Sequence, residues 1–482
     1  MSISHTLSNA LTGLTASARM AEVVSSNLSN VLTDGYGRRV VNLSAQQVGG
    51  RGAGVLVDGI TRIVDRGLLA ERRLAEANAG YNATLANGLG SLEALIGAPD
   101  DASGLAGRVA SLELALGSAA ADPSNNLNLE QVFYRLQDLA LTLNDAQSGI
   151  QSARQQADAD IATEVDALNN ALQRVEQLNG DIAKSRTQGM DPSALIDQRQ
   201  AILDQISGIV PIRVMDRGND RVAVMTESGA MLLDGNAVEI GFSTATAVAP
   251  GWTFANGMLS GLTLNGEPAS LTDGVGRLSG GSLGAAFEMR DEVLPEAQAE
   301  LDAIARDLIE RFADPTVDPS LAVGDPGLLT DSGAAFDPLN ELGIAGRISV
   351  NALVDPNAGG DLWRIRDGVG AGAAGPVGDA TQLDRWVAGL SMQTVLSTGG
   401  AGATASGHAI SYASGISIDR VRADESAAYA SARWSAVREA ELANGVDSDQ
   451  EMQLLLQIET AYAANARVVE VADAMLRRLM EI

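Results

Sequence analysis

Residues 455–479 read LLQIETAYAANARVVEVADAMLRRL, and their apolar positions recur at alternating steps of three and four. This spacing predicts an amphipathic helix with a narrow seam of the coiled-coil type. Because a seam made mostly of alanine and leucine buries little area, we expect this helix to need a partner helix. The seam positions are Leu455, Ile458, Tyr462, Asn465, Val469, Ala472, Leu476 and Leu479.

The other end of the chain carries the same alternation. It predicts a second terminal helix over about residues 7–32, and the two terminal helices would pack against each other or against copies in neighbouring subunits. A helical hairpin that only closes its own domain is the alternative interpretation of the pattern. The N-terminal seam positions are Leu7, Leu11, Leu14, Ala18, Ala21, Ser25, Leu28 and Leu32.

Helical periodicity also dominates a long stretch after the first glycine-rich segment. Apolar residues recur at helical spacing in residues 85–96, 129–143 and 161–182, which predicts long antiparallel helices in a rod-shaped bundle. A further helix should begin at Asp191-Pro192 and end near Ser207, because aspartate is a good N-cap and proline is tolerated in the first turn.

The period changes after this helix, where short alternating runs are separated by turns containing glycine. These runs predict antiparallel hairpins and a separate β-domain. From about Gln382 the chain should be helical again, with a break at Gly399 to Gly407. The strands of the β-domain are expected at 209–216, 221–226, 230–233 and 252–254, and further short strands at 40–63, 348–353 and 362–366.

These patterns together predict a mainly α fold with inserted β. The N- and C-terminal parts of the chain would form a long helical bundle with terminal coiled-coil helices, and an antiparallel β-domain would point outward, so the multi-domain architecture is discontinuous. The predicted domains are a terminal axial region, 1–62 with 440–482; a helical bundle, 63–207 with 283–313 and 382–439; a β-domain, 208–282; and a loop-rich segment, 314–381, that either completes the β-domain or forms its own lobe.

Composition excludes several classes of function. The net charge of -28 argues against nucleic acid, whose phosphates require a basic face. The absence of cysteine excludes disulfide scaffolds and thiolate sites. We find no apolar run long enough to span a membrane and no usable signal peptide.

The sequence offers little for catalysis, so we expect neither an enzyme nor a cofactor. The two histidines, His5 and His408, lie far apart, and His408 is expected to be solvated in a glycine-rich loop. Residues 370–375 have the glycine spacing of a dinucleotide loop, but Pro376 and Gly378 stand where a helix should begin, which favours a linker.

Several motifs carry a resemblance to a known family. Residues 26–39, SNLSNVLTDGYGRR, together with 450–468, resemble the N- and C-terminal signatures of the bacterial flagellar axial proteins, which include rod, hook and hook-associated subunits. Residues 191–199 and the stretch 280–295 resemble, more narrowly, the hook-associated proteins, the adaptors at the hook–filament junction. The resemblance covers most of the chain and is weakest over residues 314–379.

The resemblance implies a structural junction subunit that is exported by the flagellar type III route and is needed for filament assembly. It would be cytoplasmic before export and extracellular afterwards, at the hook–filament junction. Implied partners are copies of itself in a ring or short helical layer, the hook subunit, the second hook–filament junction protein and an export chaperone, with no nucleic acid and no membrane insertion. A hook or distal rod subunit is the close alternative, and a secreted enzyme acting on glycan is the distant one.

The seams and the terminal signatures together define an expected assembly interface. It consists of Leu7, Leu11, Leu14, Leu28, Asn30, Leu455, Ile458, Tyr462, Val469, Leu476 and Leu479.

Overall fold

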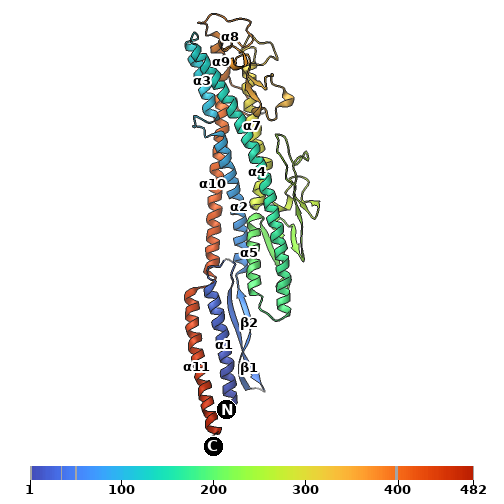
Figure 1. Cartoon of the computed structure of the whole chain (residues 1–482), viewed down its shortest axis with the longest axis vertical. Coiled ribbons are helices and arrows are strands. Elements are labelled where there is room, and N and C mark those ends of the chain that lie inside the picture. Colours follow the sequence, from blue (N-terminus) through green and yellow to red (C-terminus); the bar gives the residue numbers. More distant parts are fainter. Residues whose placement is uncertain (1–2, 34, 49–50, 397–399, 481–482) are drawn as a thin grey trace.

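The computed structural model describes residues 3–33, 35–48, 51–396 and 400–480. The molecule is elongated, with the helices nearest the two chain ends side by side at one end and a loop-rich lobe at the other (Figure 1). We call residues 3–63 with 448–480 the terminal region and residues 66–443 the rod. The predicted fold class, mainly α with small antiparallel sheets, is confirmed.

Helices account for most of the rod and for both ends of the chain. Short 3-10 segments and one π-helical turn, Met289–Val293, complete the set. The α-helices are α1 Ile3–Ser29, α2 Arg66–Ile96, α3 Leu105–Ala121, α4 Asn126–Thr187, α5 Ser193–Ile209, α6 Gly281–Glu288, α7 Leu294–Ala313, α8 Trp363–Asp367, α9 Thr381–Ser391, α10 Ala405–Ala443 and α11 Ser448–Met480.

The strands form small antiparallel sheets. Sheet order is β1-β2, β3-β4-β5-β6, β7-β8-β9 and β10-β11. The strands are β1 Arg38–Val48, β2 Arg51–Ile63, β3 Ile212–Asp216, β4 Val222–Thr226, β5 Met231–Asp234, β6 Asn236–Ala237, β7 Ile240–Gly241, β8 Thr263–Leu264, β9 Glu267–Pro268, β10 Leu329–Asp331 and β11 Ile348–Val350.

Helix α4 is the spine of the rod. The sequence predicted separate helical segments at 129–143 and 161–182, and the structure joins them into one helix of 62 residues. It begins at Asn125, whose side chain accepts a hydrogen bond from the Leu127 N–H at 3.0 Å, as an N-cap should. Its apolar stripe contributes to two cores in turn, because buried apolar residues up to Ala157 lie in the first and those from Ile161 lie in the second.

The first core lies at the end of the rod away from the termini. It is formed by parts of α2, α3, α4, α7, α9 and α10 together with residues of the 314–381 segment. Trp386 is fully buried there, and its Nε1 donates to the Ile365 carbonyl at 2.9 Å. The 314–381 segment therefore packs as a lobe on this end, and none of its described residues belongs to the core that contains the β3–β9 strands.

The second core joins the β3–β9 region to α4, α5 and α6. Two asparagines of α4 bind strand backbones directly. Asn169 donates to the Ile240 carbonyl at 2.7 Å and accepts from its N–H at 2.9 Å, and Asn179 does the same for Val222 at 2.8 and 3.1 Å. The β region lies along the outer side of α4 (Figure 1), and its inner face is part of the rod's packing.

Two predicted strands are wrong. Residues 252–254 form an irregular loop, because Asn256 Oδ1 accepts from the Thr253 N–H at 3.1 Å and Arg154 donates to the Trp252 carbonyl at 2.6 Å. Residues 362–366 are mostly helical, in α8. The alternation of polar and apolar residues around Arg364 resembles that of a strand. In the structure, Arg364 donates to the carbonyls of Val369 and Ala371, which lie beyond the end of that helix.

His408 is buried, which corrects the solvated loop that we expected. It lies in the first turn of α10, with Nε2 2.9 Å from the Thr394 carbonyl oxygen. Helix α10 begins where Thr404 Oγ1 accepts from the Gly407 N–H at 3.1 Å, so the predicted break ends a few residues early. Gly399, where that break was expected to begin, lies outside the described residues.

The terminal region consists of α1, α11 and one long hairpin of β1 and β2, in place of the short strands expected at 40–63. The hairpin packs along α1, and α11 lies on the other side of that helix (Figure 1). Helix α1 ends at Ser29, a few residues before the expected end near Leu32: the Asn30 Nδ2 donates to the Ser26 carbonyl at 2.8 Å, and Gly35 adopts a φ of +78°. Asp34 lies outside the described residues.

Candidate assembly interface

Helices α1 and α11 pack along each other with their small side chains inward. The buried residues of α1 are small or β-branched. Gly13 faces Asn465 so closely that an added Cβ would lie 2.7 Å from Asn465 Nδ2. This approach explains why a glycine stands in the middle of a helix, where it otherwise weakens the helix. The buried residues are Ala10, Ala16, Ser17, Val23, Val24 and Asn27 on α1, and Glu451, Ile458 and Ala472 on α11.

The residues that the sequence placed in the assembly interface lie mostly outside this contact. Of that set only Ile458 is buried. Intermediate exposure is found at Leu7, Leu14, Leu28, Asn30, Leu455 and Val469. The most exposed side chains of the set are those of Leu11, Tyr462, Leu476 and Leu479, with Leu11 51% and Leu479 61% exposed.

The difference has a simple physical cause. Helix α1 carries two apolar stripes, one with leucines at 7, 11 and 14 and one with small residues at 10, 13, 16 and 17. The small stripe lets α11 approach closely, so it is used within the monomer, whereas the leucine stripe is only partly covered, with Leu11 exposed.

The outer faces of the two terminal helices therefore present many large apolar side chains to solvent. Clusters of exposed apolar side chains often mark interaction sites in soluble proteins. The exposed residues are Leu11 on α1, Leu32 just after that helix, and Met452, Leu456, Tyr462, Val468, Val471, Met475, Leu476, Leu479 and Met480 on α11.

A buried polar cluster ties the terminal region together at the end nearest the rod. The side chain of Asn27 is hydrogen-bonded to both backbone groups of Arg39, accepting from its N–H at 3.0 Å and donating to its carbonyl at 2.9 Å. Asn27 also donates to Glu451 at 3.1 Å, and Arg38 donates to the same carboxylate at 2.8 Å. Because Glu451 is only 1% exposed, these contacts fix α1, β1 and α11 as one unit.

A second cluster connects this unit to α5 of the rod. Asp197 lies in the 191–199 motif, and its carboxylate accepts from Arg39 at 2.6 Å, from Arg62 at 2.6 Å and from the Gly37 N–H at 3.1 Å. Arg62 also binds Gln200. Three sequence motifs that are far apart in the chain, 26–39, 191–199 and 450–468, thus meet at the boundary between the terminal region and the rod.

Sequence reasoning did not single out Asn27, Asp197 or Glu451. The partners of the Asn27–Glu451 hydrogen bond are 424 positions apart, so no local pattern connects them. A usable signal did exist, because Glu451 stands one heptad before Ile458 and two before Asn465. A polar residue repeated at a seam position marks a specific pairing of helices.

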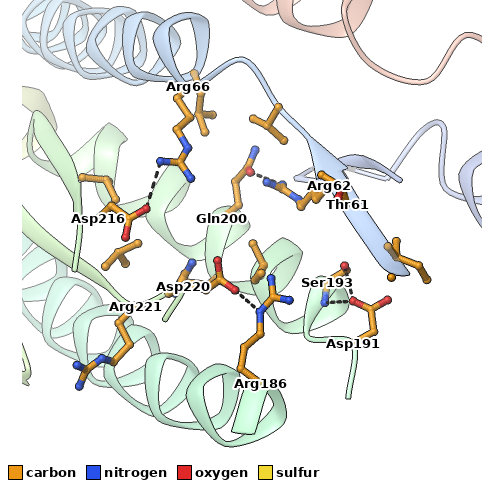
Figure 2. A pocket seen from close by; sticks show the side chains of 18 of the residues that line it. Thr61, Arg62, Arg66, Arg186, Asp191, Ser193, Gln200, Asp216, Asp220 and Arg221 are labelled. Atoms are coloured by element: carbon orange, nitrogen blue, oxygen red, sulfur yellow. Dashed lines mark hydrogen bonds and ion pairs between the residues drawn. The ribbon is translucent and has the colours of Figure 1, made fainter. Parts of the chain in front are cut away.

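A cleft of about 790 Å³ opens beside this boundary, between β2, α2, α5 and the start of the β region (Figure 2). Four of its charged groups form two ion pairs, Arg66 with Asp216 at 3.2 Å and Arg186 with Asp220. Arg199 is buried at its base and donates to Asn179 at 2.7 Å, and burial lowers the pKa of its guanidinium to about 10. The lining is a structural ionic network without a nucleophile and base pair.

Neither metal nor membrane chemistry is evident in the described ranges. There, no three or more His, Cys, Asp or Glu side chains are grouped so as to hold a metal ion. None of the helices in those ranges combines the length and hydropathy needed to cross a bilayer.

Comparison with protein families gives two matches in this chain. Residues 89–315 match the flagellar hook-associated protein FlgK helical domain. Residues 443–482 match the C-terminal region of the flagellar basal body rod FlgEFG proteins. The two matches lie on either side of the boundary where the polar clusters meet.

Comparison with individual proteins points the same way. Flagellar hook-associated protein 1 of Bacillus subtilis (strain 168) is 25% identical, over 98% of this chain and 97% of its own length. The protein of that name from Escherichia coli (strain K12) is 21% identical over 64% of this chain and 56% of its own length, and that from Salmonella typhimurium is 22% identical over 48% and 43%.

One solved structure, described as the flagellar hook junction protein FlgK from Burkholderia pseudomallei, aligns with a TM-score of 0.46 at 20% identity, over 55% of this chain and 47% of that chain. The predicted family is confirmed by the family match over 89–315 and by the relative that spans nearly the whole chain. These matches support hook-associated protein 1 as the family of this chain and a structural role in the flagellum.

Proposed function

We propose that this protein is the junction adaptor between the flagellar hook and the filament. The observation that carries the proposal is the terminal region, whose two helices pack together through small residues and leave Leu11 of α1 and many large apolar side chains of α11 exposed. A subunit whose rod has a buried core and whose terminal region exposes apolar side chains is suited to joining a tubular assembly through that terminal region.

In this proposal the terminal helices line the inner tube, and copies of the chain form a ring or short helical layer. The exposed leucines of α1 and α11 pack against helices of neighbouring subunits, where burial of each large side chain contributes about 1.5–3 kcal/mol. Leu7, Leu11, Leu14 and Leu28 with Leu455, Tyr462, Val469, Leu476 and Leu479 form the contact, Ile458 supports it from within the monomer, and Asn30 ends the first helix.

The other partners follow from the position of an adaptor. The hook subunit lies on one side of the layer and the second hook–filament junction protein on the other, and an export chaperone holds the chain in the cytoplasm. Export occurs through the flagellar type III route, so the final location is extracellular, at the hook tip. The match of residues 443–482 to axial rod proteins supports assembly within the same axial structure.

The test is a charge placed on the uncovered face. Leu479→Asp should leave the monomer folded and abolish filament growth, because an unpaired carboxylate in a packed helical interface costs several kcal/mol. Cells should then make hooks, release filament subunits into the medium and fail to swim. Normal filaments on such cells would refute the proposal.

Leu141→Asp is the matched control. Leu141 is a leucine of α4 that is 53% exposed, close to the 61% of Leu479, but it lies in the rod. Cells that carry this variant should grow normal filaments, since the same charge is added away from the terminal face.

The terminal match to rod proteins also favours a second candidate, a hook or distal rod subunit. Immunogold labelling separates the two. An adaptor gives a thin band at the hook tip, whereas a hook subunit labels the whole hook and a rod subunit lies below it.

A further inference from the structure

The cleft beside the boundary is unusual in this acidic chain because it gathers positive charge. Its lining contains seven arginines and four aspartates, whereas the whole chain has 33 lysines and arginines against 61 aspartates and glutamates. Arg62 from β2, Arg66 from α2 and Arg186 from the end of α4 point into it from three sides (Figure 2). We call this site the arginine cleft.

Carboxylates of the same chain compensate part of this charge. Arg62 and Arg73 bind aspartates that are not part of the lining, and Arg19 binds a glutamate of its own helix. The ion pairs of Arg66 and Arg186 lie at the mouth, where 81% and 51% of the arginine side chains are exposed. Exposed ion pairs contribute only about 0–1 kcal/mol, so these two arginines can exchange their partners at little cost.

Arg199 at the base of the cleft lacks a carboxylate of its own. It is 6% exposed and donates to two neutral oxygens, Asn179 Oδ1 at 2.7 Å and the Asp220 carbonyl at 2.5 Å. The Asp220 carboxylate also attracts it, but that carboxylate is bound by Arg186. Because a buried charge without a counter-charge is costly, a further anion in the cleft stabilises this arrangement.

The opposite charge gathers where α10 meets α11. The stretch EAELANGVDSDQE holds five acidic residues and no basic one. Glu441 and Glu451 form ion pairs within the chain, and Asp447 caps α11 by accepting from two N–H groups of its first turn. Glu439 and Asp449 are exposed and form no ion pair in the part of the chain that the structure describes. We call this stretch, residues 439–451, the acidic joint.

The acidic joint and the arginine cleft lie at the same level of the molecule but on different sides of it (Figure 1). Helix α2 packs between α10 and α5, and α1 packs between α11 and the hairpin. A chain therefore keeps its own joint away from its own cleft. In a layer of copies that stand side by side, the joint of one copy can face the cleft of the next. Such a head-to-tail contact either closes a ring or continues as a helix.

We propose that the acidic joint of one copy docks in the arginine cleft of a neighbouring copy. The inference rests on the proposed function in one respect, the side-by-side arrangement of copies in a layer. Glu439 and Asp449 bind the arginines at the mouth, and the added negative charge compensates Arg199. Charge pairs across an interface set the orientation of the partners more than their affinity. This contact therefore fixes how each copy stands beside the next, while the apolar terminal faces supply the burial.

Cross-linking in assembled flagella tests the contact. Because the protein contains no cysteine, Ser448→Cys in the joint and Met190→Cys in the cleft lining introduce two unique, exposed thiols and leave every charge in place. A short bismaleimide cross-linker, applied to flagella isolated from cells with this double variant, should link copies of the chain into dimers and longer ladders.

The control keeps Ser448→Cys and replaces Met190→Cys by Leu141→Cys. Leu141 is 53% exposed, close to the 54% of Met190, but it lies outside the cleft, toward the other end of α4. This variant should give monomers only.

The role of charge is tested in the background of the first pair. Adding Arg186→Gln should lower the yield of linked copies at least about threefold, because one attracting arginine of the mouth is lost. Arg174→Gln, at an exposed arginine of α4 outside the cleft, should leave the yield unchanged. Monomers alone, links to a different protein, or equal yields with the two glutamine variants would overturn the inference. Immunogold labelling reports the proposed function separately, because a normal band at the hook tip without linked copies overturns only this contact.

Discussion

The rod and the terminal region are both built from helices with apolar seams, yet they use those seams in opposite ways. In the rod, the seam residues of α4 such as Leu168 and Leu172 are completely buried. In the terminal region, α1 and α11 bury alanine, valine and serine and leave leucine and methionine open. A similar sequence period thus produces a fully buried core in the rod and a partly exposed apolar surface in the terminal region.

Side-chain size explains the difference. The rod surrounds each large side chain with several helices and the β region, whereas the terminal region has only two helices and one hairpin. With so few elements, closest packing is reached through glycine and alanine, as at Gly13. Leucines such as Leu11 and Leu479 stay exposed in the monomer, and their burial requires another chain. The following predictions probe this contrast, starting with the largest effect.

A charge in the rod should be far more damaging than one in the terminal region. Leu168→Asp places a carboxylate in a site with 0% exposure, so we expect a loss of about 5 kcal/mol or more in the free energy of unfolding. Urea unfolding followed by circular dichroism measures it. A loss below about 1 kcal/mol would mean that the second core is not the packed core described here.

The buried ion pair between α4 and the segment before α7 should come next. Arg290 is 0% exposed and binds Asp158, which is 1% exposed, at 2.7 Å; Asp158 also accepts from the Ala245 N–H at 2.7 Å. Asp158→Ala removes both contacts and should cost about 3 kcal/mol in unfolding free energy. Asp160→Ala, at an exposed position of the same helix, should change it by less than about 0.5 kcal/mol. Equal effects of the two would contradict this account.

Hydrogen exchange of the monomer should show the contrast residue by residue. The terminal helices bury little large apolar surface, so they should open at a lower free energy than the rod. We expect amides of α1 and α11 to exchange at least about 100-fold faster than those around Leu168. Equal protection in a confirmed monomer would show that the terminal region is as stable as the rod.

The smallest expected effect on the monomer is that of Leu479→Asp. Its side chain already faces solvent, so the melting temperature of the monomer should move by less than the equivalent of about 0.5 kcal/mol. Differential scanning calorimetry at low protein concentration measures it. A large drop would place Leu479 in an intramolecular core and remove the basis for using this variant to test assembly.

Periodicity and turn chemistry predicted much of the fold. The leucine and valine spacing in 129–182 located α4, and the turns near Gly218 and Gly235, both with positive φ, marked the ends of β3 and β5. These signals are local, because a helix face or a tight turn is specified by residues a few positions apart.

What could not be predicted depended on distant partners. The choice between the two stripes of α1 is made by α11 and the hairpin, and the burial of His408 by Thr394. In the candidate interface, the leucines proposed from their spacing stay a prediction, and Asp197 and Glu451 were not singled out because they act through arginines from other elements. A short alternation of polar and apolar residues, such as that around Arg364, is compatible with both a strand and a helix. Tertiary contacts determine which of the two forms.

The continuity of α4 has a mechanical consequence. At 1.5 Å per residue, its 62 residues form a strut of about 90 Å that contributes to both cores. A load applied to the β region or to the outer lobe is carried along one uninterrupted set of backbone hydrogen bonds, with no loop to absorb it. Compression or torsion at one end of the rod therefore reaches the other end with little loss.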